Sequence, residues 1–127
     1  MINPVEVHIR RSKALSESTG NIQIRIQHGG DEHDLVSWTR FISRLSKTTD
    51  GWRLLTLDAI YDRDTLTPVI PTQATAVKLD DLGSRTSYRC LSWVLSERGF
   101  KIKQDLPGTD RPESVAKLMK SALDWLN

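Results

Sequence analysis

The stretch 50–71, DGWRLLTLDAIYDRDTLTPVIP, decides the fold class of this chain. It opens with an Asp-Gly turn, and from Trp52 its residues alternate in the manner of a strand. The strand ends in a polar cluster, Tyr-Asp-Arg-Asp, at 61–64. Pro68 and Pro71 follow, and neither can donate a hydrogen bond to a regular ladder. The stretch therefore predicts a strand from Trp52 to about the start of the cluster, and then an extended connector.

Three more strands are predicted ahead of this stretch. Val5, Val7 and Ile9 alternate with polar residues, which is the period of a half-buried strand. A turn at 10–12 leads to a strand at 13–27, in which Gly20 predicts a bulge or bend. Gly29-Gly30 predicts the next turn, and a third strand spans 33–46. Both faces of the third strand carry apolar residues, so it is expected to be covered on both sides.

The second half of the chain predicts helices. One is expected at about 84–99, with Gly99 as its left-handed C-terminal cap. The other is expected at about 111–126, with Pro112 in its first turn and a capping box formed by Asp110 and Glu113. An apolar stripe follows at helical spacing. It consists of Val115, Leu118, Met119, Ala122 and Leu126.

The predicted fold class is therefore α+β, a curved antiparallel four-stranded meander followed by two C-terminal helices. The sheet covers about 4–64, the connector about 65–80, and residues 1–127 form a single domain. A length of 127 residues suits one domain with one core.

Composition narrows the classes of function. The net charge of +2 is too small to indicate a nucleic-acid partner, and a basic group near the first turn is expected to be a solvated edge. This group is His8, Arg10, Arg11 and Lys13. A single cysteine, Cys90, excludes an internal disulfide and favours a reducing compartment. With no signal-peptide pattern and no long apolar run, we expect a cytoplasmic protein with no membrane partner.

Three residues are candidates for acid/base chemistry. Tyr61 and Asp64 lie in the polar cluster and could act as proton donor and base. The alternative is structural, with Asp64 pairing with Arg40. His33 stands beside Asp34, but neighbouring strand residues point to opposite faces, so His33 could equally be an exposed turn residue.

Two residues are candidates for binding a ligand. Trp38 and Arg40 share one face of the third strand, where the ring offers flat apolar surface and the guanidinium can hold a carboxylate or phenolate. The alternative is packing and an internal ion pair. Cys90 lies within a helical pattern and is expected in the core. The histidines have no ligand-like spacing, so no metal is expected.

Four segments carry a resemblance to a known family. They are 34–41 (Asp-Leu-Val-Ser-Trp-Thr-Arg-Phe), 50–53 (Asp-Gly-Trp-Arg), 60–64 (Ile-Tyr-Asp-Arg-Asp, then Leu66 and Pro68) and 105–113 (Asp-Leu-Pro-Gly-Thr-Asp-Arg-Pro-Glu), before a helix ending in Trp125-Leu126. Together they resemble the SnoaL-like branch of the nuclear transport factor 2-like superfamily. The resemblance covers the chain from about Pro4 to its end.

This resemblance implies a cone-shaped fold with an internal pocket, and dimers that form through the sheet. Its members include cofactor-independent cyclases, dehydratases and isomerases that act on hydrophobic polyketide- or steroid-like molecules. Family members usually begin with helices that carry further acid/base residues, and here Met1 falls almost directly on the first strand. The expected function is therefore a SnoaL-like lyase or isomerase, with a non-catalytic ligand-binding or dimerising domain as the alternative. A homodimer is expected, and the amphipathic last helix, with Trp125 near its end, is a candidate for the contact.

Overall fold

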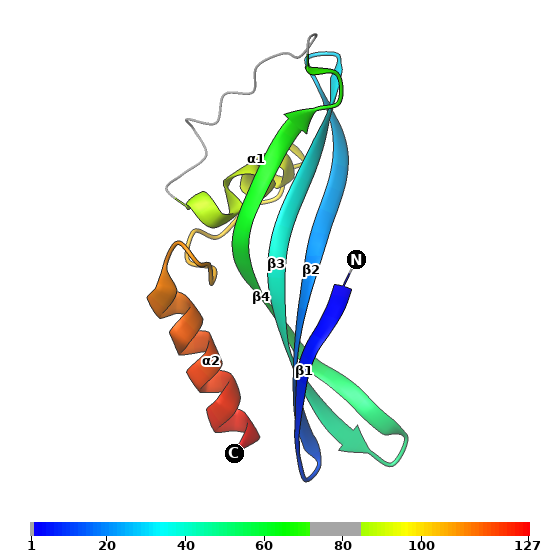
Figure 1. The fold of residues 1–127 in the computed structure, drawn as a ribbon, viewed down its shortest axis with the longest axis vertical. Coiled ribbons are helices and arrows are strands. Elements are labelled where there is room, and N and C mark those ends of the chain that lie inside the picture. Colours follow the sequence, from blue (N-terminus) through cyan, green and yellow to red (C-terminus); the bar gives the residue numbers. More distant parts are fainter. Residues whose placement is uncertain (1, 72–84) are drawn as a thin grey trace.

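A computed structural model describes residues 2–71 and 85–127 of the chain. Four strands form one antiparallel sheet in the order β1-β2-β3-β4, which confirms the predicted meander. They are β1 (Ile2–Arg10), β2 (Lys13–His28), β3 (Asp31–Thr48) and β4 (Gly51–Pro68). A short 3-10 helix, η2 (Thr86–Tyr88), leads into α1 (Arg89–Glu97), and α2 (Pro112–Leu126) ends the chain. Figure 1 shows α1 and α2 at successive levels along a long, twisted sheet.

The turn between β2 and β3 follows directly from its glycines. Gly29 and Gly30 have φ of 61° and 82°, which is the left-handed region that a tight two-residue hairpin requires. The pairing of β2 with β3 then runs without a register shift from His28↔Asp31 to Lys13↔Ser46. The bulge expected at Gly20 is therefore wrong. Gly20 is buried in the continuous ladder, and its carbonyl accepts a hydrogen bond from Thr39 Oγ1 at 3.2 Å.

Strand β4 is longer than the sequence predicted. Its pairing with β3 continues through Leu66 and Thr67 to Pro68, which pairs with His33. The first residues expected in the connector are thus strand, because β4 is an edge strand and Pro68 is its last residue, where a missing N–H is tolerated. Residues 72–84, which include most of the remaining connector and the expected helix start at Ser84, lie outside the described residues. Arg85 is extended and 86–88 form η2, so α1 begins at Arg89, later than the predicted start at about 84.

The two helices cover opposite faces of the sheet. Leu35 packs with Tyr88, Leu91 and Val94, so its side of β3 is the face covered by α1, called here the α1 face. Ile42 packs against α2, on what is called the α2 face. Because β3 has an unbroken register with β2, and Leu35 and Ile42 are seven positions apart, which is an odd number, they point to opposite sides of the sheet. The expectation that the third strand is covered on both sides is confirmed.

Helix α2 uses its apolar stripe within the chain. Ala122 and Leu126 are buried against Leu15, Ile42 and Ile60, and the rest of the stripe packs around them. Pro112 lies in the first turn, as predicted, but no side chain caps this helix end. The predicted capping box is wrong because Asp110 bonds elsewhere.

The basic group near the first turn holds the other end of α2. Arg10 Nη1 donates to Asn127 Oδ1 at 2.9 Å, and Lys13 Nζ donates to the carbonyl of Trp125 at 2.9 Å. Cations are favourable at this end because the last carbonyls of a helix carry partial negative charge. Among the described helices, none is long and apolar enough to cross a membrane.

Helix α1 ends as the sequence predicted. Gly99 has a φ of 88°, and the N–H groups of Gly99 and Phe100 donate to the carbonyls of Ser96 and Leu95 at 3.0 Å each. These two hydrogen bonds, together with the positive φ of Gly99, form the left-handed glycine cap expected after Glu97. Cys90 is buried in the same helix, which confirms its predicted place in the core.

Candidate functional site

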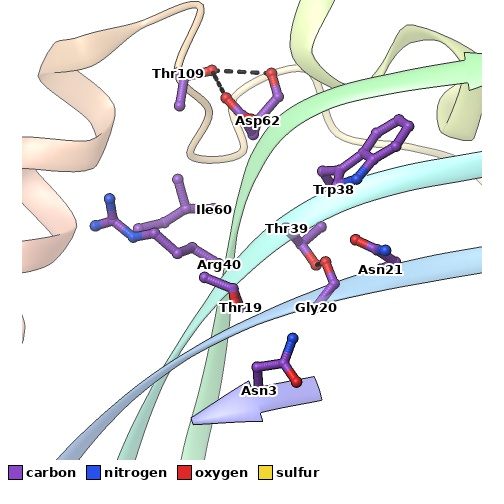
Figure 2. Close-up of a pocket in the computed structure, with 10 residues that line it drawn as sticks. All are labelled: Asn3, Thr19, Gly20, Asn21, Trp38, Thr39, Arg40, Ile60, Asp62 and Thr109. Atoms are coloured by element: carbon purple, nitrogen blue, oxygen red, sulfur yellow. Dashed lines mark hydrogen bonds between the residues drawn. The ribbon is translucent and has the colours of Figure 1, made fainter. Parts of the chain in front are cut away.

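A pocket of about 400 Å³ lies on the α2 face, where β1, β2, β3 and β4 come together below the loop that leads to α2. Figure 2 shows its side chains, which come mainly from the middle of the sheet. The residues that line it are Asn3, Thr19, Gly20, Asn21, Trp38, Thr39, Arg40, Ile60, Asp62 and Thr109. The volume lies within the range of small-molecule sites.

The pocket combines apolar surface with polar groups that have no hydrogen-bond partner among residues 2–71 and 85–127. Trp38 and Ile60 supply the apolar walls. In the described part of the chain, no hydrogen bond uses the side chains of Asn3, Thr19 or Asn21, so each can still donate to or accept from a ligand.

Arg40 is the cationic group of the pocket. Its Nε lies 2.9 Å from Glu17 Oε1, close enough for an ion pair. The two groups are not aligned for a hydrogen bond, so the buried Nε–H has no acceptor among the described residues. The partner predicted for Arg40 was Asp64, and that prediction is wrong, because Asp64 lies on the α1 face. The Arg40 side chain as a whole is 39% exposed, so its guanidinium could still bind a ligand oxygen.

The upper rim of the pocket is formed where the chain crosses the edge of β4. The N–H of Tyr61 donates to the Pro107 carbonyl at 3.1 Å, and the N–H of Thr109 donates to the Tyr61 carbonyl at 2.9 Å. We call residues 107–109 the strap, because they carry the chain from the α1 face to the α2 face. Thr109 Oγ1 then contacts Asp62 Oδ1 at 3.1 Å, as Figure 2 shows.

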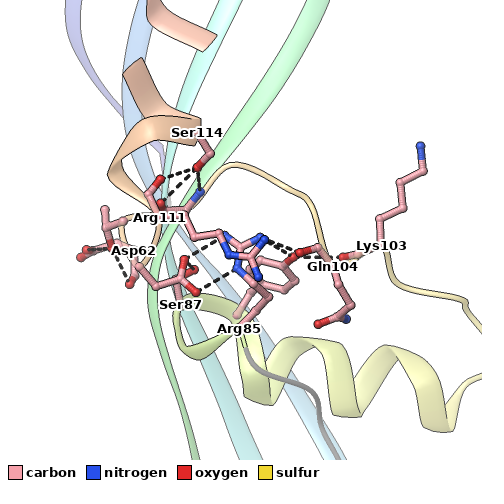
Figure 3. A network of polar contacts seen from close by, with 11 residues as sticks. Asp62, Arg85, Ser87, Lys103, Gln104, Arg111 and Ser114 are labelled. Atoms are coloured by element: carbon pink, nitrogen blue, oxygen red, sulfur yellow. Dashed lines mark hydrogen bonds and ion pairs between the residues drawn. The ribbon is translucent and has the colours of Figure 1, made fainter. Parts of the chain in front are cut away.

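A buried ion pair holds the strap in place (Figure 3). Arg85, which is 1% exposed, donates to both carboxylate oxygens of Asp110 at 2.9 and 2.8 Å. Ser87 Oγ donates to the same carboxylate at 2.7 Å. Arg85 also donates to the carbonyl of Gln104 at 2.8 Å. The bonds from Arg85, and then Ser87, hold the pKa of Asp110 well below its ordinary value.

A bulge in β4 decides which way the polar cluster points. Trp38 pairs with Arg63 and Thr39 with Tyr61, so Asp62 is the extra residue of the bulge. In a regular strand, Tyr61 and Asp64 would point to opposite faces, since they are three residues apart. The bulge instead places both on the α1 face and leaves Asp62 at the pocket on the α2 face.

Tyr61 and Asp64 therefore meet α1 and η2 and do not line the pocket. The centroid of the Tyr61 ring lies 5.1 Å from that of the Tyr88 ring. Burial raises the pKa of Tyr61, and the charge interaction with Tyr88 raises it further. Asp64 Oδ2 accepts the N–H of Leu91 at 2.8 Å, so it caps the N-terminal turn of α1. Burial raises the pKa of Asp64, although the hydrogen bonds from Leu91 and Cys90 lower it in part. Burial also raises the pKa of the Cys90 thiol to about 12.

His33 lies farther along the α1 face, among aromatic rings. It is 2% exposed, which corrects the alternative of an exposed turn residue, and its Nδ1 is 3.3 Å from the carbonyl oxygen of Asp31. Its ring is 6.1 Å from that of His28, which in turn packs edge-on to Trp93. Asp34 points to the other face and pairs with Arg25 at 2.8 Å, as the alternation predicted. The structure thus brings Trp38 and Arg40 together in the pocket and keeps Tyr61, Asp64 and His33 on the opposite face.

The chain has a distant likeness to a curated protein. No family model matches the chain. It is 27% identical, over 124 residues, to Pea pathogenicity protein 2 of Fusarium vanettenii. The match covers 95% of this chain and 53% of the relative, so the chain spans about half the length of that protein.

Sequence reasoning missed most of the pocket. In the strands that carry Asn3, Thr19 and Asn21, the alternation of polar and apolar residues predicts only that these polar side chains face solvent. Asp62 belongs to the polar cluster at 61–64, but its position depends on a bulge that alternation does not predict. The segment 105–113, noted for its resemblance, was the available signal for Thr109 and for the strap.

Proposed function

We propose that this chain is a small-molecule-binding domain of SnoaL-like architecture, with a sheet that curves around a ligand at Trp38 and Arg40. The observation that carries the proposal is the pocket on the α2 face. It presents one partly exposed cation, Arg40, and three polar side chains that have no hydrogen-bond partner among the described residues, beside the apolar surface of Trp38 and Ile60. The residues expected to perform catalysis point away from it, which favours binding over the lyase or isomerase reaction.

The chemistry of the lining suggests the class of ligand. Arg40 favours a carboxylate or phenolate, because a guanidinium presents donors in a planar fork that matches such oxygens. Trp38 favours a flat apolar ring system. The Arg63 guanidinium carbon lies 4.2 Å from the Trp38 ring centroid and so steadies the indole. A hydrophobic aromatic or steroid-like acid fits this combination, and we place this activity in the cytoplasm.

A second candidate function rests on Asp62. This carboxylate lines the pocket and contacts Thr109, so it could act as a general base toward a bound ligand. In that case the chain would be a cofactor-independent lyase or isomerase of the kind the resemblance implies, with Asp62 as its base in place of Tyr61 or Asp64. The name of the relative mentions pathogenicity on pea and states neither a reaction nor a ligand.

Isothermal titration calorimetry with 1-naphthoate and cholate tests the binding proposal. We expect the wild-type chain to bind at least one of these acids at one site per chain. Arg40→Gln should weaken binding about tenfold or more, which corresponds to about 1.4 kcal/mol. Arg53→Gln is the matched control, because Arg53 is an exposed arginine on β4 whose side chain donates to a backbone carbonyl away from the pocket.

Two further variants separate the alternatives. Tyr61→Phe and Asp64→Asn should leave the affinity unchanged if the ligand binds on the α2 face. Equal affinity in Arg40→Gln and wild type, or loss of binding in Asp64→Asn with the fold retained, would contradict the proposal. Conversion of a bound ligand that Asp62→Asn abolishes would favour the enzyme over the binding domain.

A further inference from the structure

Strand β2 is paired along its outer edge for only half of its length. β1 pairs with β2 from Lys13 to Gly20, whereas β2 continues to His28 and stays paired with β3 throughout. Among residues 2–71 and 85–127, no strand pairs with the outer side of 22–28. Figure 1 shows β1 ending beside the middle of β2, with no described strand next to the rest of that edge. We call residues 22–28 the free edge.

The free edge presents backbone donors and acceptors that the sheet does not use. The carbonyl of Glu32 accepts the N–H of Val69 at 2.9 Å, so the backbone groups of Glu32 face the β4 side. Glu32 pairs with Gln27, whose N–H and carbonyl therefore point away from β3. Because the register is unbroken, Arg25 and Gln23 repeat this orientation at every second residue. The free edge thus offers three N–H groups and three carbonyls at the spacing of an extended strand.

The other edges of the sheet carry protections that the free edge lacks. Sheets avoid unwanted pairing through prolines, bulges and covering segments. β1 has Pro4 with a register shift beside it, and β4 is covered by the strap at Tyr61 and ends at Pro68. The free edge contains neither a proline nor a register shift. Its charged residue, Arg25, is turned back onto β3, where it donates to Asp34 at 2.8 Å. The free edge is therefore open to pairing with another strand.

The side chains of the free edge alternate between an apolar and a polar row. Ile22, Ile24 and Ile26 lie on the α1 face, where they are half-buried against the cluster around α1. Gln23 and Gln27 are exposed on the reverse side. In an added strand, every second side chain would lie beside the isoleucines and complete the burial of that row. The pattern therefore favours a partner strand that is apolar at alternate positions.

A hollow next to the apolar row can take a side chain of such a strand. Its volume is about 360 Å³, and it lies between the end of β2 and the C-terminal half of α1. Ile26 and His28 line it from the strand, and Trp93 and Arg98 line it from the helix. The rings of His28 and Trp93 pack edge-on with their centroids 5.1 Å apart, which holds this wall in place. The hollow adds side-chain selectivity to the backbone bonds of the edge.

The charge on the free edge disfavours a second copy of the chain as the occupant. Full antiparallel overlap of two free edges about a two-fold axis would place Arg25 directly opposite its own counterpart. Like charges in directly opposed positions destabilise a strand pair. A strand from a different protein can instead place an acidic residue opposite Arg25.

We propose that the free edge binds an extended peptide segment of another protein, which joins the sheet as a fifth strand antiparallel to β2 and in line with β1. Backbone hydrogen bonds to 23, 25 and 27 supply the affinity, and apolar side chains beside the isoleucine row and the hollow supply the selectivity. The proposal does not depend on the pocket on the α2 face or on its ligand.

Fluorescence anisotropy of a labelled, end-capped peptide, Val-Thr-Ile-Glu-Val-Thr-Val, tests the proposal. In the antiparallel register its glutamate lies opposite Arg25 and its apolar residues lie on the α1 face. We expect the full chain to bind it with a Kd below about 500 µM. Gln23→Pro should weaken binding about tenfold or more, because it removes an outward N–H and no bond of the sheet. Gln23→Thr is the matched control and should bind as wild type does.

Two methylated peptides test the backbone bonds without changing the protein. Methyl groups on the backbone nitrogens of the three polar residues remove the N–H groups that face β2, so this peptide should not bind. Methyl groups on the nitrogens of the isoleucine and the last two valines point away from β2, so that peptide should still bind. This comparison decides the proposal even if Gln23→Pro fails to fold.

Other outcomes would overturn the proposal. The first is a wild-type chain that shows no binding at about 500 µM. The second is equal binding of the two methylated peptides, or equal binding by wild type and a Gln23→Pro variant with the circular dichroism of wild type. The third is self-association of the wild-type chain that Gln23→Pro removes, which would assign the free edge to a second copy.

Discussion

Asp110 shows how one carboxylate can hold two parts of this chain together. It accepts bonds from Arg85 and Ser87, and Arg85 is almost completely buried. Asp110→Asn should lower the free energy of unfolding by about 3 kcal/mol, since removing one partner leaves the other charge buried and uncompensated. Urea unfolding at pH 7 measures this loss.

The stabilisation lost in Asp110→Asn should depend on pH. The pKa of Asp110 is lowered in the folded state from its ordinary value of 3.8, so the pair stabilises the fold above about pH 4, and this stability is lost as pH falls further. The difference between wild type and Asp110→Asn should therefore be constant from about pH 5 to 7 and shrink below pH 4. A difference under about 0.5 kcal/mol at pH 7, or one that does not change down to pH 2.5, would contradict this role.

Sequence alone did not predict the partner of Asp110. Its spacing to Glu113 and Pro112 is that of a helix start, and this local pattern predicted a capping box. The actual donor, Arg85, precedes it by 25 residues and reaches it only because the chain turns back after α1. Local spacing favours local partners, whereas a buried arginine far away in sequence competes more strongly for the same carboxylate.

The strap has no room for a side chain at Gly108. A Cβ on Gly108 would overlap Ser87 Oγ and would lie 2.6 Å from Asp110 Oδ1. Gly108→Ala should therefore cost about 2 kcal/mol in the free energy of unfolding, as overpacked positions do. Adding Ser87→Ala removes the nearest obstacle, so the double variant should be more stable than the sum of the single effects. Thermal and urea unfolding of the four proteins measures the coupling, and additive effects would contradict the crowding.

The strands and helices themselves were largely predictable. Alternation identified all four strands, and the glycine turns and Gly99 marked their ends and that of α1 correctly, because these signals depend on neighbouring residues only. The sequence predicts a β4 that is too short, because prolines are expected to stop pairing, whereas the edge strand continues to Pro68. The bulge at Asp62 was not predicted, and it reverses the direction of every side chain beyond it.

In the whole molecule, the sheet separates the residues expected to act in catalysis from the pocket. The α1 face carries Tyr61, Asp64 and His33, of which Tyr61 contacts η2 and Asp64 contacts α1. The α2 face holds the pocket. The apolar residues on both sides of the third strand predicted coverage on both faces, but not which helix covers which. That assignment depends on the strap crossing the edge of β4 at Tyr61.

The measurement that tests the central claim most directly is a titration of isotopically labelled chain with 1-naphthoate, followed by amide and indole NMR spectra. The account predicts shifts at the Trp38 indole and at the amides of Asn21, Arg40 and Thr109, which surround the pocket. The chemical shifts of the Leu91 amide in α1, which donates to Asp64, and of the His33 amide should stay unchanged. Shifts at Leu91 and His33, with none at Trp38 and Arg40, would contradict the account and place the site on the α1 face.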